Sequence, residues 1–259
     1  MKESTIDIKI IALTAALFLC GPLRSFAFAN PFSNGERLVF DISWYGVSGG
    51  TTVMEVRKEI DNDRSVYKVS SVTKSNRVIS LFYPVNDLVE TYMDTATFYP
   101  YRYRSKQEEG TYSSDKEILF DREKKLATLI KHNDGGKTHT DEVPPMVQDP
   151  LSVVYFFRTL PVEIGKDVSL DVYDGKKNWT LVIQVLKKEK VWTPAGTFNT
   201  IKIKALIKFE GIFINKGDVL VWFTDDAART PVMMESKIKI GHITAMLIEK
   251  QDELSSDKK

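Results

Sequence analysis

The feature that most constrains the fold is one helix-forming stretch, residues 149–161, in a chain that otherwise has the alternation of strands. Asp149 can accept hydrogen bonds from the free amides of a first helical turn, and Pro150 suits the first helical position. Pro161 ends the helix, because the residue before a proline is displaced from helical backbone angles. The apolar side chains fall on both sides: Leu151, Val154 and Tyr155 on one, and Val153, Phe156, Phe157 and Leu160 on the other. A helix that is apolar nearly all round must be buried nearly all round, so we expect a sheet curved around it.

The remaining apolar residues alternate with polar ones. Leu38, Phe40, Ile42 and Trp44 show the period of a strand that is buried on one face. The same reasoning predicts strands over 51–60, 66–73, 88–93, 101–108, 111–120, 126–131, 168–172, 179–185, 201–209, 219–224, 232–240 and 243–250, and a short helix within 75–83. The predicted fold is mainly β: a large curved antiparallel sheet, or half-barrel, wrapped around one short buried helix.

A short repeat links the two halves of the chain. Asp94-Thr95-Ala96 followed by Pro100 matches Asp225-Asp226-Ala227 followed by Pro231. In each copy the first aspartate would accept hydrogen bonds in a turn, and the proline would begin a strand where no ladder donor is needed. The repeat predicts two equivalent strand–turn–strand connectors, with chance as the alternative for so short a match.

Residues 1–29 have the pattern of a signal peptide. Lys2 and Lys9 precede an apolar run over 10–19, and Ala27-Phe28-Ala29 gives an A-x-A cleavage pattern. A membrane span needs roughly 18 or more apolar residues, so no stable span is expected after cleavage behind Ala29. We therefore predict export to the periplasm, a single β-rich domain over 30–250 and a polar, disordered tail over 251–259.

Cysteine use and charge exclude several classes of function. Cys20 is the single cysteine, and it lies inside the predicted signal behind Leu19, which is too large for a lipoprotein signal. The cleaved chain then has no thiol for a disulfide, a nucleophile or a metal. The formal net charge of the full chain is +1, which argues against nucleic acid as a partner, because that binding needs a basic excess.

Motifs for catalysis and metal binding occur without their structural context. Residues 46–50 match the G-x-S-x-G nucleophile pattern, but a β-branched strand follows where a helix is required, so a hairpin turn is favoured. His132 and His139 flank a glycine-rich turn. Asp134 and Asp141 lie nearby, but the spacing is not that of a metal site, and exposed turn histidines are favoured. We predict a protein that is not an enzyme and has no cofactor or metal.

A cavity between sheet and helix is the leading prediction for a site. Its candidate lining residues are Phe82, Tyr83, Tyr92, Val153, Phe156, Phe157, Leu160, Trp222, Met234 and Met246. Aromatic side chains and flexible methionines accommodate lipid-like ligands. The same residues would equally fill a packed core, so both interpretations stay open.

Several stretches carry a resemblance that spans nearly all of the chain after residue 29. They are Glu36 to Val47, Gly50 to Val56, Asp149 to Ser152, Phe156 to Arg158, Thr193 to Phe198 and Ile238 to Leu247. These stretches resemble an uncharacterised exported bacterial family, the domain of unknown function 3108, which brings no catalytic residues. More distantly, the Asp-x-Ala-x-x-x-Pro connectors resemble those of the periplasmic lipoprotein carrier LolA and its outer-membrane receptor LolB. That resemblance implies a half-open barrel plugged by helices and, by analogy, a cavity for acyl chains.

Two functions are favoured, and a third, an unrecognised hydrolase acting through Ser48, ranks last. The first is non-catalytic binding of a hydrophobic or lipid-like ligand, or of an envelope lipoprotein's acyl group, between sheet and helix. The alternative is a structural or protein-interaction module of the cell envelope with a packed core, which docks through a sheet edge or a face carrying Tyr99, Tyr101 and Tyr103. The two functions differ in whether the interior is vacant, which depends on tertiary packing.

Overall fold

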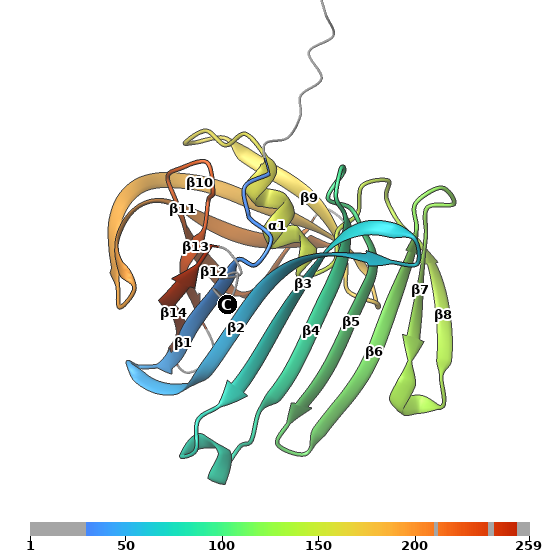
Figure 1. The fold of residues 1–259 in the computed structure, drawn as a ribbon, viewed down its shortest axis with the longest axis horizontal. Coiled ribbons are helices and arrows are strands. Elements are labelled where there is room, and N and C mark those ends of the chain that lie inside the picture. The colour runs from blue at the N-terminus through green and yellow to red at the C-terminus, as the bar shows by residue number, and fades with distance from the viewer. Residues whose placement is uncertain (1–29, 210–211, 238–240, 253–259) are drawn as a thin grey trace, which may run out of the picture.

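The computed structural model describes residues 30–209, 212–237 and 241–252. Within these ranges the chain forms one 14-stranded antiparallel sheet, one α-helix and two short 3-10 helices. The strands are β1 (Arg37–Trp44), β2 (Val47–Asp61), β3 (Arg64–Ser75), β4 (Asn86–Asp94), β5 (Pro100–Glu109), β6 (Tyr112–Asp121), β7 (Leu126–Lys131), β8 (Lys137–Glu142), β9 (Asp167–Tyr173), β10 (Asn178–Thr193), β11 (Gly196–Phe209), β12 (Ile212–Thr224), β13 (Pro231–Lys237) and β14 (His242–Gln251). The helices are η1 (Ile79–Leu81), η2 (His132–Asp134) and α1 (Ser152–Thr159). The predicted large curved sheet around one short helix is confirmed (Figure 1).

The strand order places the two ends of the domain at the middle of the sheet. β1 pairs with both β2 and β14, and the sheet then runs outward to β8 on one side and to β9 on the other. These two outer strands do not pair, so the sheet stays open, and its two arms curve around α1 (Figure 1). A parallel bridge between Gln148 and Val172 joins the segment before α1 to the edge strand β9. This bridge covers part of an edge that would otherwise expose unpaired backbone groups.

Asp149 begins the helix in the predicted way. Its Oδ1 accepts hydrogen bonds from the amides of Leu151 and Ser152, both at 2.8 Å, and its own amide donates to the Ser152 hydroxyl at 2.9 Å. This reciprocal arrangement satisfies amide donors that a helix start leaves free. The helix ends at Thr159, and Leu160 is already extended before Pro161.

The helix is buried on both of its sides, as its sequence predicts, but Phe156 and Phe157, which were predicted to lie on the same side, pack into two different clusters. Phe156 packs against Tyr99 with ring centroids 5.6 Å apart, in a cluster formed with β3 to β7. Phe157 packs on the other side against Phe223, at 5.0 Å, in a cluster formed with β10 to β12. A third cluster lies between β1, β12, β13 and β14. The two arms of the sheet are therefore joined through α1 as well as through β1 and β14.

Two local predictions differ from the structure. Within 75–83 only η1 is helical, and its flanking apolar side chains are exposed. A short helix needs a surface to pack against, and without one the predicted longer helix does not form. Strand β8 was not predicted, since its sequence is polar on both faces and shows no alternation. The predicted signal peptide with Cys20, part of the strand predicted over 232–240, and the tail beyond residue 252 lie outside the described residues.

Candidate ligand cavity between the helix and the sheet

A cavity of about 460 Å³ lies between α1 and the concave face of the sheet. On the helix side it is lined by Val153, Val154 and Phe157. On the sheet side the lining is almost wholly aliphatic, aromatic or methionine, with polar side chains at Thr52, Ser71 and Thr73. Among the lining residues that the structure describes, none has a charged side chain. The described lining therefore offers mainly apolar contact, with three hydroxyl groups of which those of Thr52 and Thr73 hydrogen-bond to each other at 2.8 Å.

Strand alternation builds the sheet side of the cavity. Side chains two residues apart point to the same face of a strand, so each strand contributes alternate residues. The lining residues are Phe40 and Ile42 from β1, Leu181 and Ile183 from β10, Ile203 and Ala205 from β11, Val219, Val221 and Phe223 from β12, and Ala245 from β14. Met54 from β2 and Met233 and Met234 from β13 add flexible side chains. The two adjacent methionines of β13 depart from the alternation, close to a register shift between β12 and β13. Met234 is 41% exposed, so it lies at a mouth of the cavity.

Three of the ten predicted lining residues border this cavity, namely Val153, Phe157 and Met234. Phe156 and Leu160 belong instead to the side of α1 that packs against the cluster with Tyr99. These two side chains fill a core, as the alternative interpretation proposed for the whole set.

Trp222 and Met246 do not border the cavity. Their neighbours along the strand, such as Val221 and Ala245, line the cavity, so the alternation of a strand turns both away from it. The Trp222 indole nitrogen donates a hydrogen bond of 2.8 Å to Glu189. The prediction that these two residues line the cavity is wrong, because the position of a residue in its strand, and not its side-chain type, determines whether it faces the cavity.

Tyr92, Phe82 and Tyr83 are also outside the cavity. Tyr92 lies beneath the guanidinium of Arg102, which is 3.8 Å from its ring centroid. Its neighbour Thr91 bonds to Asp149 at the helix start, which places Tyr92 on the outer face of β4. Phe82 and Tyr83 are exposed in the loop that follows η1. For these three residues the predicted cavity position is wrong.

The start of α1 holds a buried carboxylate close to the cavity-lining turn. Burial raises the pKa of Asp149 to about 6, although hydrogen bonds from Thr91, Ser152 and Leu151 favour its charged form. Asp149 itself does not line the cavity. We therefore expect the protonation state of Asp149 to affect the stability of the helix start rather than the binding of a ligand.

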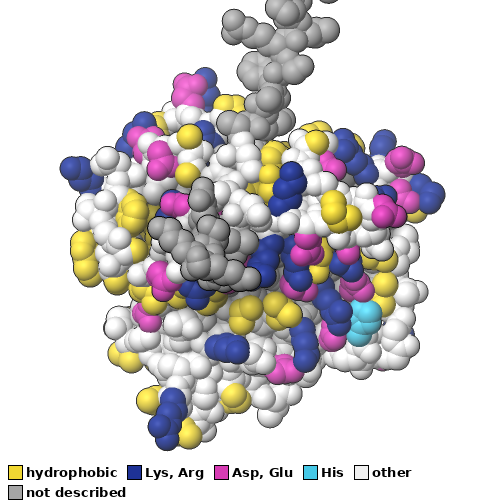
Figure 2. Space-filling view, viewed as in Figure 1, with side chains coloured by type: hydrophobic (Ala, Val, Ile, Leu, Met, Phe, Trp, Pro, Cys, Tyr) yellow, Lys and Arg dark blue, Asp and Glu magenta, His cyan; other side chains and the backbone are white. Residues whose placement is uncertain are grey.

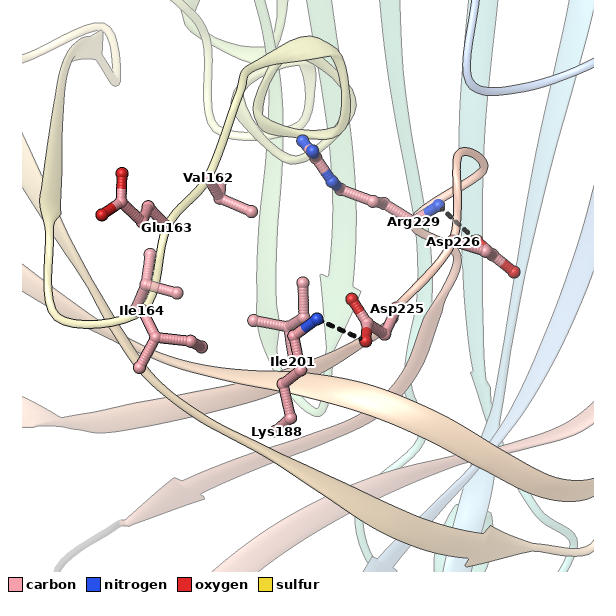
Figure 3. Close-up of a pocket in the computed structure, with 9 residues that line it drawn as sticks. Val162, Glu163, Ile164, Lys188, Ile201, Asp225, Asp226 and Arg229 are labelled. Carbon is pink, nitrogen blue, oxygen red and sulfur yellow. Dashed lines mark hydrogen bonds and ion pairs between the residues drawn. The ribbon is translucent and has the colours of Figure 1, made fainter.

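A second, polar cleft of about 390 Å³ lies beside the end of α1 (Figure 3). Lys188 and Asp225 form an ion pair of 2.7 Å across it. The Arg229 guanidinium donates to the carbonyl oxygens of Arg158 and Leu160 at the helix end, and burial lowers its pKa. Because these charged groups already have protein partners, we interpret this cleft as the junction that holds the helix end against the β12–β13 connector.

The predicted connectors both form, with one correction. Asp94 Oδ1 accepts hydrogen bonds from the amides of Ala96 and Thr97, as expected. In the second copy the acceptor is Asp226, whose Oδ1 bonds to the amides of the second and third residues after it, and Asp225 pairs with Lys188 instead. The prediction that Asp225 holds the turn is therefore wrong by one residue. A backbone hydrogen bond from Asp94 to Tyr99 closes the first connector, and one from Thr224 to Thr230 closes the second, so the second connector is one residue longer.

The motifs weighed for catalysis and for metal binding are scattered. Ser48 lies within β2, and its hydroxyl donates to Asp41, so it is not on a strand-to-helix elbow. His132 bonds to Glu117, and His139 to Asp141. Within the described ranges no three His, Cys, Asp or Glu side chains form a set that could hold a metal ion.

The tyrosine face proposed for docking does not exist as an exposed surface. Tyr99 and Tyr103 are buried in the cluster on one side of α1. Tyr101 points elsewhere, because the strand register shifts beside it, and its hydroxyl donates to Asp61. A partner would therefore have to bind another surface.

The fold and the cavity together define a class: an open, curved antiparallel sheet around one helix, with an apolar cavity between them. The chain belongs to the family described as Protein of unknown function (DUF3108), whose model matches residues 39–248. No curated protein matches the sequence. The described residues include no helix with the length and hydropathy that a membrane crossing requires.

One of the similar solved structures supports the fold. The chain is similar to the crystal structure of a β-barrel-like protein of the domain of unknown function DUF1849 from Brucella abortus, with a TM-score of 0.58 and 11% identity, over 85% of this chain and 98% of that one. A chain assigned as a lipoprotein from Parabacteroides distasonis gives a TM-score of 0.37 at 13% identity, over 85% and 98% of the two chains. A chain assigned as an exported protein with a YmcC-like fold from Bacteroides fragilis gives 0.36 at 16%, over 87% and 99%. The first similarity shows a shared fold, and the other two are too low to carry an argument.

Proposed function

We propose that this protein is a non-catalytic, exported protein that binds a hydrophobic or lipid-like ligand, such as an acyl chain, in the cavity between α1 and the sheet. The observation that carries the proposal is the apolar space of about 460 Å³ beside Val153 and Phe157. Pockets for small ligands usually measure about 300–1,000 Å³ and are mostly apolar with a few polar groups. The cavity fits that description in both size and lining.

Water is a poor occupant of such a space. A buried water typically makes about three hydrogen bonds to polar groups of the protein. Of the three hydroxyls in the lining, those of Thr52 and Thr73 already hydrogen-bond to each other at 2.8 Å, and the β10–β12 side of the lining is apolar. An acyl chain would gain about 0.8 kcal/mol for each CH₂ group removed from water. The free energy of apolar burial therefore favours an acyl chain over water.

The position of α1 suggests how the cavity is loaded. The helix forms one wall, and it is only about two turns long, so its movement would change the cavity more than movement of any single strand. The alternative function, a protein-interaction module with a packed core, predicts no such space. The cavity of about 460 Å³ supports binding over that alternative.

A pair of substitutions on neighbouring residues tests the proposal. Ala205 lines the cavity, whereas Leu206 points to the opposite face of β11. Ala205→Phe fills the space, and Leu206→Phe is its matched control on the same strand. The unmodified protein is first analysed by native mass spectrometry and solvent extraction, and fluorescent fatty-acid uptake is then compared for all three proteins.

We expect a bound lipid or saturable fatty-acid uptake in the unmodified protein and in Leu206→Phe, and at least a roughly tenfold loss of uptake in Ala205→Phe. Thermal unfolding shows whether each variant is folded. A bare mass without uptake, or equal uptake by the two folded variants, would overturn the proposal and favour the packed-core alternative.

A further inference from the structure

Exposed apolar side chains gather at the end of the sheet that faces away from α1. They belong to two tips: the β1–β2 turn and the β3–β4 loop that contains η1. We call this set the apolar rim; it comprises Tyr45, Val47, Val78, Leu81, Phe82 and Tyr83. Both tips lie at the lower end of the view in Figure 1, and at the β3–β4 tip Figure 2 shows hydrophobic side chains beside a basic one. Leu81 and Phe82 are 77% and 83% exposed, which is unusual for large apolar residues.

Hydrogen bonds join the two tips into one surface. The Asn76 amide donates to the Gly49 carbonyl at 2.9 Å, and its side-chain amide donates to the Ser48 carbonyl at 2.7 Å. The Asn76 side-chain oxygen then accepts the amide of Ile79 at 2.9 Å, which fixes the start of η1. The apolar rim is therefore held in place by backbone groups and does not depend on burial of its own side chains.

The cavity extends toward this rim. Ile42 and Thr73 line the cavity, and each lies only a few residues before one of the two tips. The exposed lining residue Met234 is paired with Ala245, which is itself paired with Ile42. The mouth of the cavity and the apolar rim are therefore at the same end of the sheet.

The charge of the rim fits one kind of partner. Residues 44–50 and 76–83 contain a single charged residue, Arg77. The carboxylate beside the rim is that of Glu109 on the β5–β6 tip, which hydrogen-bonds to Tyr83. Arg77 is exposed, and within the described part of the chain no carboxylate pairs with it. Aromatic and aliphatic side chains beside a cation are typical of segments that lie in the interface of a lipid bilayer.

We propose that the apolar rim docks on the surface of a lipid bilayer, with Leu81 and Phe82 entering the interface and Arg77 contacting lipid phosphate. A stable protein interface takes about 800 Å² from each partner, supplied by roughly 20–30 residues, which is more than two hairpin tips present. Docking in this way places the cavity mouth against lipid, so an apolar ligand would pass without crossing water. That consequence rests on the proposed function, whereas the docking itself does not.

Vesicle co-sedimentation of the purified protein tests the docking. The probes are phosphatidylcholine vesicles, with and without a minor fraction of phosphatidylglycerol. The test variant is Leu81→Ser/Phe82→Ser. The control is Ile60→Ser/Trp192→Ser, which removes side chains of 70% and 66% exposure from hairpins at the opposite end of the strands.

We expect the unmodified protein and the control to bind both kinds of vesicle, and Leu81→Ser/Phe82→Ser to bind roughly tenfold less, since apolar burial drives the insertion. Arg77→Ser should lose a few-fold of the binding to vesicles that contain phosphatidylglycerol, and the salt dependence should be small. Absence of vesicle binding, equal binding by test and control, or rim-dependent self-association in light scattering would overturn the proposal. Ala205→Phe should still dock, so docking and ligand uptake fail independently.

Discussion

The Arg158 guanidinium at the end of α1 and the Glu36 carboxylate just before β1 form a two-pronged ion pair, with both Nη–Oε distances at 2.7 Å. Both side chains are almost completely buried. The guanidinium also donates to the carbonyl oxygens of Ala228 and Pro31, at 3.0 and 3.2 Å. One side chain thus joins the helix to the start of the domain and to the β12–β13 connector, which are far apart in sequence.

The first prediction concerns this ion pair. Arg158→Met leaves the Glu36 carboxylate buried without a partner, and we expect a loss of roughly 3–5 kcal/mol in the free energy of unfolding. Arg158→Met/Glu36→Gln removes the uncompensated charge and should recover a large part of that loss. Urea unfolding of the two variants measures the difference. If the double variant is no more stable than Arg158→Met, the unpaired Glu36 carboxylate is not the cause of the stability loss in Arg158→Met.

The second prediction follows from the raised pKa of Asp149. Burial raises this pKa to about 6 from its usual value of 3.8, so the folded protein favours the protonated form more than the unfolded chain does. The contribution of Asp149 to stability is therefore greatest below about pH 4, falls as the pH rises toward 6, and is constant above that. A shift of about two pKa units corresponds to about 3 kcal/mol.

Asp149→Asn is the matched variant, because asparagine keeps an oxygen for the helix-start amides and does not titrate. Relative to the unmodified protein, we expect Asp149→Asn to gain about 3 kcal/mol of stability between about pH 4 and 7. Urea unfolding across this range gives the comparison. A stability difference that does not change with pH would contradict the assignment of a raised pKa.

The third prediction separates the two aspartates of the second connector. Asp226→Ala removes the acceptor for two backbone amides and the Thr224 hydroxyl, so we expect a loss of roughly 1 kcal/mol. Asp225→Ala removes a solvent-exposed ion pair with Lys188, which contributes roughly 0–1 kcal/mol and should cost less. Thermal unfolding of both variants decides between them, and a larger loss for Asp225→Ala would reverse our assignment.

The fourth prediction uses two adjacent glycines of β2. A Cβ on Gly50 would lie 2.3 Å from the carbonyl oxygen of Lys74 in the paired strand, whereas a Cβ on Gly49 would have no contact closer than 3.6 Å. Gly50→Ala should therefore destabilise the protein by roughly 1–3 kcal/mol, and Gly49→Ala should be tolerated. Equal unfolding midpoints for the two variants would show that β3 moves to admit the methyl group.

The candidate site was predictable only in part. Val153 and Phe157 could be placed because a helix that is apolar all round has to face the interior on every side. Val221, Phe223 and Ile203 carry an equally clear alternation, but alternation does not say which of the two faces is concave. The side-chain types of Trp222 and Met246 suit a cavity lining, but neither residue borders the cavity. The exposed Phe82 was misplaced because hydrophobicity alone suggested burial.

The sequence by itself determined the class of the fold and the position of its helix. Period-two alternation, tight turns and the residues at both ends of 149–161 are local signals. Each is specified by the backbone preferences of a short stretch of sequence, so it can be read without knowing the tertiary structure. The tertiary structure decided the strand order, the pairing of Arg158 with Glu36, and the vacancy between α1 and the sheet. Each of these depends on residues far apart in the chain and on how completely their side chains fill a shared volume, which no local pattern specifies.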